Sequence, residues 1–161
     1  GTSGCATISN PSATTVTCTR VGLARDGRLP PCRSSENCVS SSSVRSPAKF
    51  SAPWNYATET SDAKVAFNKL LDVIPLQIKD ANLVDVNDDN LYILAEFPAK
   101  VPPGSVDVVE FLLRPADNVC SFRSATRDSV FVYPLQQPVS DRGSNRDRLE
   151  AIRNQLGWAA L

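Results

Sequence analysis

The residues whose types could do chemistry are charged side chains that interrupt apolar segments in the second half of the chain. Glu96, Glu110 and Arg123 each stand inside an otherwise apolar run, and Tyr92 lies near the first of them. A buried charge is costly unless it is paired, so we expect the two carboxylates and the guanidinium to meet, with Tyr92 at the rim. One interpretation is a small site for a polar or anionic ligand, with Arg123 as its anchor.

The alternative, which we favour, is a structural ion-pair network that fixes the final helix to the sheet, because structural pairs use the same residue types. The strand register decides which side chains meet. A slip of one residue would send Arg123 to the opposite face from Glu110, and the sequence leaves this register open.

A second polar group surrounds the start of the predicted C-terminal helix. Asp141, Asn145 and Arg146 lie where exposed backbone N–H groups could hold an anion or a partner's carboxylate. The alternative is helix capping together with surface salt bridges. Asp141 favours this alternative, because its carboxylate already occupies the position that an anion would take.

The composition argues against most hydrolytic chemistry. The chain contains no histidine, which removes the usual general base and the commonest metal ligand. Cys38 lies close to Ser40 and Ser41, but nothing in the sequence would activate these nucleophiles. There is also no CxxC motif to hold zinc. We therefore predict no catalytic residue, no metal site, no cofactor and no enzymatic activity.

Five cysteines, an odd number, are spread over the chain at Cys5, Cys18, Cys32, Cys38 and Cys120. Cys32 and Cys38 flank a five-residue loop that a disulfide could close, and a Cys5–Cys18 bridge could tie down the N-terminal segment. Oxidised cysteines would indicate an organelle lumen, a periplasm or the cell exterior. The alternative is a set of reduced thiols.

The elements that must position these residues begin after a long irregular start. Residues 1–52 are rich in Ser, Thr, Pro and Gly without helical or strand periodicity, and predict an extended arm strapped on the core. A helix should begin at Thr60 or Ser61 and end at Pro75, because apolar residues recur with helical spacing. A strand should then run from Leu76 to Val86, followed by a turn.

Three further strands and a final helix complete the predicted order, and irregular structure is expected from Thr126 to Val139. The final helix should start near Ser144 or Asn145 and stop at Gly157. The fold class is therefore α+β: a four-stranded antiparallel sheet with two packed helices and an extended, cysteine-bearing N-terminal arm, with residues 53–161 as a single domain. The three further strands are predicted at residues 91–97, 106–113 and 119–125.

Length and charge limit the kind of partner. The 161 residues correspond to one domain, and 17 basic residues balance 17 acidic ones, so nucleic acid is not expected as a partner. No apolar run reaches the length of a membrane-spanning helix, and we expect no transmembrane segment. The chain begins at Gly1 and lacks methionine, from which we expect a processed product whose targeting peptide was removed.

Five motifs follow one another along the chain. They are Cys32-Arg33-Ser34-Ser35-Glu36-Asn37-Cys38-Val39-Ser40-Ser41, Tyr92 with Ala95-Glu96-Phe97, Asp107-Val108-Val109-Glu110-Phe111, Arg123-Ser124-Ala125, and the run from Ser140 to Arg153. In this order they resemble the domain-of-unknown-function family fourteen ninety-nine. The resemblance covers Leu29 to Leu156, and it implies an architecture and a compartment, because the family occurs in bacteria and plastid-bearing eukaryotes and has no established activity. This chain has Arg33 and Glu36 where the family pattern has prolines, and its segment between Ala125 and Ser140 is longer.

These observations together favour a mature plastid protein of the thylakoid lumen. We expect a non-enzymatic accessory or assembly subunit that docks on a larger membrane complex, with a photosystem as the candidate. The partner-binding residues would be Phe131, Val132, Tyr133 and Leu135, which form an apolar group in a Pro-flanked segment; the alternative is that they pack on the protein's own core. The competing function is a small polar-ligand-binding protein or enzyme that uses the Glu/Glu/Arg cluster.

Overall fold

The chain folds mainly into β-structure. The computed structural model describes residues 5–18, 21–33, 36–77, 80–100, 102–132, 139–140 and 143–161. Within these residues, ten strands form a three-stranded and a seven-stranded sheet, and two α-helices accompany them, so the predicted four-stranded α+β fold is wrong. The strands are β1 (Cys5–Ser9), β2 (Ala13–Cys18), β3 (Cys38–Ser40), β4 (Trp54–Asn55), β5 (Asn82–Asn87), β6 (Tyr92–Pro98), β7 (Val106–Arg114), β8 (Val119–Thr126), β9 (Asp128–Val132) and β10 (Ala159–Ala160).

The seven-stranded sheet contains the strands that the sequence predicted and adds short ones at its edge. Its order is β10-β4-β8-β7-β6-β5, with β3 also paired to β8, and every pair is antiparallel. The predicted strands at residues 91–97, 106–113 and 119–125 correspond to β6, β7 and β8. The prediction missed β3, β4 and β10, because strands of two or three residues carry no periodicity of their own.

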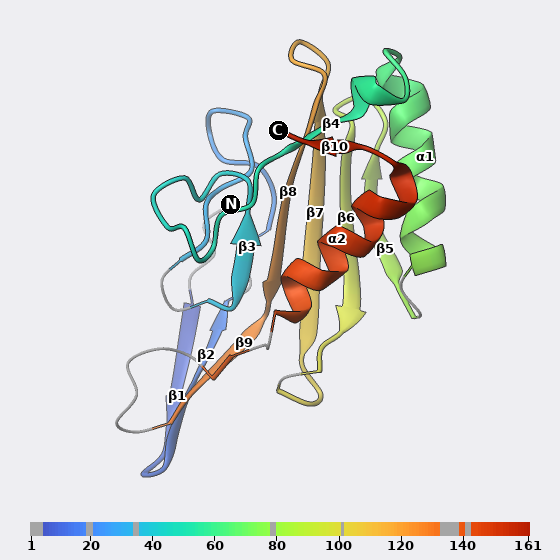
Figure 1. The fold of residues 1–161 in the computed structure, drawn as a ribbon. Helices are drawn as coiled ribbons and strands as arrows, with labels where there is room; N and C mark the ends of the chain where they lie inside the picture. The colour runs from blue at the N-terminus through green and yellow to red at the C-terminus, as the bar shows by residue number, and fades with distance from the viewer. Residues whose placement is uncertain are drawn as a thin grey trace.

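Two helices cover one face of this sheet, α1 (Ala63–Gln77) and α2 (Ser144–Leu156) (Figure 1). The boundaries of α1 differ from the prediction. Asp62 accepts hydrogen bonds from the N–H groups of Lys64 and Val65 and so takes the capping position expected of Thr60 or Ser61. Because a proline in the last turn removes only one hydrogen bond, the helix continues past Pro75.

The predicted strand after Pro75 begins later than expected. Leu76 is the penultimate residue of α1, and β5 starts only at Asn82; residues 78–79 lie outside the described part of the chain. The hairpin that follows is confirmed, since β5 pairs with β6. α2 begins at Ser144, as predicted, and ends before Gly157, whose φ of 76° is the left-handed conformation that glycine adopts most easily.

Aromatic side chains fill the layer between the sheet and the helices. Trp54 of β4 packs against Phe122, with ring centroids 4.7 Å apart, and against Trp158, 6.3 Å away. All three rings are fully buried. Because β4 pairs with β10, segments from before α1 and after α2 close one edge of the sheet together. β3, which lies within the first 52 residues, also pairs with β8, so the N-terminal segment contributes a strand to this sheet.

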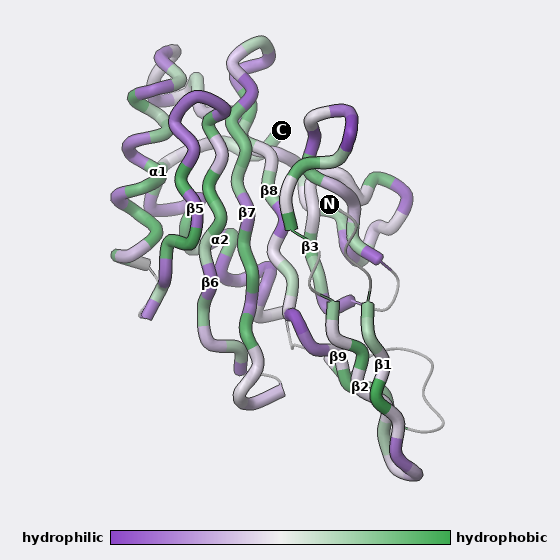
Figure 2. The backbone as a smooth tube through the Cα atoms, turned by 180° about the vertical axis from the view of Figure 1, so that it is seen from behind, coloured by the Kyte–Doolittle hydropathy of each residue, from purple (hydrophilic) through white to green (hydrophobic). Residues whose placement is uncertain are grey.

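The three-stranded sheet, here called the ribbon, has the order β1-β2-β9 and extends away from the seven-stranded sheet (Figures 1 and 2). Two predictions are wrong here. The N-terminal segment, expected to be an irregular arm, contains β1 and β2, and the segment after Thr126, expected to be irregular, contains β9. Thr-rich and Val-rich strands from the two segments pair with each other across more than 110 residues of sequence, as Thr17 does with Asp128. No local pattern reveals such a pairing, because each strand finds its partner only in the folded chain.

Both expected disulfides are present, and they staple the N-terminal segment. Cys5–Cys18 joins two residues that face each other across the β1–β2 pair. Cys32–Cys38 closes a loop before β3. Cys120 is a buried free thiol.

Residues 21–33, here called the strap, pack on part of the face of the seven-stranded sheet opposite the helices. Figure 2 views the molecule from this side, with β5, β6 and β7 in front of the helices. Leu23 and Leu29 of the strap pack on apolar side chains that include Tyr92, Leu94 and Val108. The central strands are thus buried on both faces, which explains their nearly continuous apolar sequences.

Candidate functional site: two polar clusters on opposite faces of the sheet

The strand register places Glu110 directly opposite Arg123 in the β7–β8 pair. Both side chains therefore point to the strap face. Tyr92 lies diagonally across on β6, and its hydroxyl donates a 2.7 Å hydrogen bond to Glu110 Oε2. The same oxygen accepts a 2.8 Å bond from the backbone N–H of Gly22 in the strap. We call Tyr92, Glu110, Arg123 and Glu36 the Arg123 cluster.

The carboxylate that pairs with Arg123 is Glu36, where the sequence analysis expected Glu96 and Glu110. One terminal nitrogen of Arg123 lies 2.8 Å from both carboxylate oxygens of Glu36. Arg123 is 2% exposed and Glu36 is 3% exposed, so this is a buried ion pair. Glu96 lies on the same face but pairs with Arg127 at 2.9 Å, at a position where both side chains are one-third exposed.

Two buried polar atoms of the Arg123 cluster lack a partner among the described residues: Glu110 Oε1 and Arg123 Nε. A cavity of about 20 Å³ lies beside Arg123 and Glu36. That volume suits about one water molecule. The cluster is thus closed to any larger ligand while the strap and Glu36 keep these positions.

Burial also determines which groups of this region could react. It raises the pKa of Tyr92 strongly, and the neighbouring Glu110 carboxylate raises it further. The phenol therefore stays protonated and acts as a hydrogen-bond donor. Burial likewise raises the pKa of the Cys120 thiol, so this cysteine is a poor nucleophile. In the described part of the chain, no three His, Cys, Asp or Glu side chains are grouped as a metal site.

A second polar cluster lies on the helix face and joins α2 to the sheet. Asn145 is fully buried; its carbonyl oxygen accepts a 2.7 Å bond from Ser124, and its amide nitrogen donates to Thr126 at 3.1 Å. Thr126 in turn donates to Asp107 at 2.7 Å. Arg148 donates to the other oxygen of Asp107 at 2.5 Å. These residues anchor the helix, which is the role that the sequence analysis gave to Glu96, Glu110 and Arg123.

Of the two remaining residues of the expected helix-terminus site, the structure describes only Arg146. Arg146 donates hydrogen bonds to the backbone carbonyls of Ala48 and Phe50, at 3.2 and 3.0 Å. It therefore binds the loop before β4 rather than pointing into an anion site. Asp141 lies outside the described residues.

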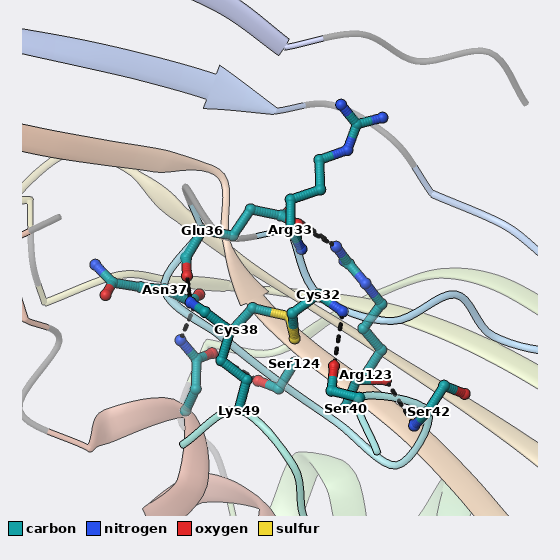
Figure 3. The surroundings of a disulfide bond; sticks show 12 residues. Cys32, Arg33, Glu36, Asn37, Cys38, Ser40, Ser42, Lys49, Arg123 and Ser124 are labelled. Atoms are coloured by element: carbon teal, nitrogen blue, oxygen red, sulfur yellow. Dashed lines mark hydrogen bonds and ion pairs between the residues drawn. A yellow bond between two sulfur atoms is a disulfide. The ribbon is translucent and has the colours of Figure 1, made fainter. Parts of the chain in front are cut away.

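The disulfide loop positions Glu36, the residue of the cluster that sequence reasoning missed (Figure 3). The backbone N–H of Arg33 donates to Glu36 Oε1 at 2.8 Å, and Lys49 Nζ donates to the Glu36 carbonyl. One signal could have pointed to Glu36: it replaces a proline of the resembled family pattern and stands between two bridged cysteines. Its distance from Arg123 in sequence hid the pairing.

The expected partner-binding residues belong to the ribbon or lie beyond what is described. Phe131 and Val132 are in β9, the first half-buried and the second 42% exposed. Tyr133 and Leu135 lie outside the described residues. β1 contributes a further exposed apolar side chain, Ile8, which is 72% exposed.

An open groove of about 330 Å³ lies at the β6–β7 end of the large sheet. Phe97, Pro98 and Val106 form its apolar part, and Glu96 is a charged group on its wall. Asp80 is a second charged group on the wall, and Glu96 already pairs with Arg127. None of the described helices is long and apolar enough to cross a membrane.

The arrangement defines a small β-rich domain with a disulfide-held polar cluster. The model of the family described as "Protein of unknown function (DUF1499)" matches residues 28–156, and the chain belongs to this family. It is also similar to a protein of Arabidopsis thaliana named "Thylakoid lumenal 17.9 kDa protein, chloroplastic". The two are 30% identical over 137 residues, which are 84% of this chain but only 58% of that relative.

Proposed function

We propose that this protein is a non-enzymatic accessory subunit or assembly factor of the thylakoid lumen, which docks through its ribbon on the lumenal side of a larger membrane complex. The observation that carries the proposal is the exposed apolar surface of the ribbon. Ile8 is 72% exposed and Val132 is 42% exposed, although burying such apolar side chains would stabilise a monomer.

The register of the ribbon gathers these side chains on one face. Ile8 pairs through Thr15 with Val130, and Ala13 pairs with Val132. Because side chains alternate between faces, these five residues point the same way. β1 and β2 contain no charged residue. Asp128 of β9 lies on the same face, opposite Thr17, and accepts hydrogen bonds from Thr17 and Ser105. The face therefore offers few of the charges that usually protect a sheet from association. Such a face fits a partner protein with an apolar contact surface.

The proposed compartment rests on two observations. The similar protein of Arabidopsis thaliana is named as lumenal and chloroplastic, and two disulfides fit an oxidising compartment. This chain spans 58% of that relative's length. A photosystem is our candidate for the complex.

The competing function, a polar-ligand-binding protein or enzyme that uses the Glu/Glu/Arg group, receives less support. Glu110 and Arg123 are at most 2% exposed, and Glu36 already occupies the guanidinium. The adjoining cavity of about 20 Å³ is too small for a metabolite. Ligand binding would require Glu36 to leave.

Native gel migration after mild detergent solubilisation of thylakoids tests the proposal. We expect the wild-type protein to co-migrate with a membrane complex and an Ile8→Asp/Val132→Asp variant to migrate as a free monomer. Leu76→Asp is the matched control, because Leu76 is equally apolar and 75% exposed but lies on α1. Recovery of the wild type only as a free monomer would overturn the docking proposal.

A further inference from the structure

The Cys32–Cys38 disulfide closes a loop that carries Glu36 and Asn37, each of which makes several hydrogen bonds outside the loop (Figure 3). The cysteines are six positions apart. Cys38 is buried in β3, where it pairs with Ala125 of β8, whereas Cys32 is only half-buried. We therefore expect a reductant to reach the bridge from the Cys32 side.

Glu36 depends on this loop to stay in the Arg123 cluster. A carboxylate that leaves water loses its hydration, and only a well-placed partner offsets that loss. Arg123 is this partner, at 2.8 Å. Once the loop is free to move, the carboxylate can return to water, and Arg123 can attract water in its place. The ion pair is thus the part of the fold most sensitive to the loop's freedom.

Asn37 links the same loop to both sheets and to α2. Its carbonyl accepts bonds from the Thr126 N–H at 2.9 Å and from the Asn145 amide at 3.2 Å. Its side-chain amide donates to the Val139 carbonyl at 2.8 Å, and its backbone N–H donates to the Ser129 hydroxyl at 3.4 Å. The loop therefore spans the junction between β8 and β9, where the ribbon leaves the large sheet.

The other disulfide, Cys5–Cys18, does not hold a loop at the junction of the two sheets. Cys5 and Cys18 face each other at the end of a hairpin in which five residue pairs are already in register. Opening that bridge leaves the backbone pairing of β1 and β2 in place. The chain thus contains a matched control for the Cys32–Cys38 bridge.

We infer that Cys32–Cys38 is a redox-sensitive latch that holds Glu36 on Arg123 and Asn37 at the junction of the two sheets. A thiolate of a dithiol reductant attacks Cys32 Sγ and forms a mixed disulfide, while Cys38 leaves as a thiolate and takes up a proton. The second thiol of the reductant then displaces Cys32, which also becomes a thiol, and the reductant is left as a disulfide. The reduced loop gains conformational freedom, so Glu36 and Asn37 leave their partners while the core under the helices stays folded.

Amide hydrogen exchange during a dithiothreitol titration tests the latch, with alkylation and mass spectrometry identifying the cysteines that have opened. The Thr126 amide is the reporter, because it donates to Asn37. The Phe111 amide in the centre of the sheet is the reference. We expect exchange at Thr126 to rise at least about tenfold as Cys32 becomes alkylated, with little change at Phe111. An unchanged Thr126 would refute the latch, and an equal rise at Phe111 would show that the bridge is a staple of the whole fold.

Two variants separate the bridges. A Cys5→Ser/Cys18→Ser protein should keep the full response at Thr126, whereas a Cys32→Ser/Cys38→Ser protein should exchange rapidly there with or without the dithiol. Glu36→Gln should raise exchange at Thr126 in the oxidised protein, since it weakens the same anchor without touching a cysteine. A response that disappears in the Cys5→Ser/Cys18→Ser protein would assign the effect to the wrong disulfide and reject the latch.

Discussion

The seven-stranded sheet and the ribbon both contain strands with apolar side chains, but the sheet buries these side chains and the ribbon leaves many of them exposed. In β7, every residue between the two ends is buried, because helices cover one face and the strap covers the other. In β1, every residue after Cys5 is exposed. Stability should therefore come from the large sheet.

The ribbon is held by other means. Backbone pairing in two antiparallel ladders, the Cys5–Cys18 bridge and hydrogen bonds from Thr17 and Ser105 to Asp128 fix its position. None of these contacts requires an apolar core. A surface that contributes little to folding is free to be used for recognition, which is why the comparison supports docking through the ribbon.

The largest effect should follow a truncation in the large sheet. Phe111→Ala removes a fully buried ring and should cost about 3–5 kcal/mol of unfolding free energy. Phe131→Ala makes the same change at a half-buried position of the ribbon and should cost about 1 kcal/mol. Urea denaturation of the oxidised proteins measures both. Equal losses would contradict the division of the molecule into a stabilising sheet and a ribbon.

The Arg123 cluster allows a matched test of buried and exposed ion pairs. Arg123→Met leaves the Glu36 carboxylate buried without its partner and should cost about 3–5 kcal/mol. Arg127→Met breaks the one-third-exposed pair with Glu96 and should cost about 1 kcal/mol or less. Adding Glu36→Gln to Arg123→Met should restore part of the loss. A larger loss at Arg127 would mean that the ribbon junction, not the cluster, carries the stability.

Two asparagines of α2 allow a comparison between a buried anchoring position and an exposed one. Asn145→Ala removes a buried side chain bonded to Ser124 and Thr126 and should cost about 1–3 kcal/mol. Asn154→Ala changes an exposed position of the same helix and should stay within about 0.5 kcal/mol of the wild type. Thermal unfolding of the two variants, side by side, measures the difference. Similar values would deny that the Asn145 amide anchors the helix.

Alkaline pH should destabilise the fold through two buried tyrosines, Tyr92 of β6 and Tyr56, which directly follows β4. Burial raises the pKa of Tyr92 and of Tyr56 in the folded protein, whereas the unfolded chain ionises near its ordinary value of about 10. The stabilisation is complete below that pH and is lost as the pH rises above it. Tyr92→Phe should cost about 1 kcal/mol at neutral pH and flatten this decline. Urea midpoints between neutral and alkaline pH measure both; an unchanged decline would exclude Tyr92 as its source.

The smallest effect on stability should come from the apolar face of the ribbon. Ile8→Thr changes an exposed position and should alter the unfolding free energy by less than about 0.5 kcal/mol. The same substitution should still weaken any docking through that face. A stability loss as large as that of Asn145→Ala would mean that Ile8 packs within the chain.

Regular elements with strong periodicity could be predicted well. The spacing of Phe67, Leu70 and Ile74 predicted α1, and these three side chains are buried. The apolar runs of β6, β7 and β8 and the Gly157 stop of α2 were equally clear. The ribbon could not be found, because β2 and β9 stabilise each other only after chain segments far apart in sequence have met.

The candidate site was predicted in part. The sequence left open whether Glu110 and Arg123 share a sheet face; the register places them opposite each other, and Tyr92 contacts Glu110. Their partners were not foreseen, since Glu36 and Gly22 come from the loop-rich N-terminal segment. Whether any of these residues has a role in binding stays a prediction.

The amino-acid sequence by itself determined which segments are helix or central strand, which cysteines can bridge, and which charges must find partners, because periodicity, spacing and desolvation act on each segment locally. Only the tertiary structure decided that Arg123 pairs with Glu36, that Asn145 anchors α2, and that β9 leaves the large sheet to join β1 and β2. Those outcomes depend on strand register and on long-range pairing, and both are settled by the free energy of the whole folded chain.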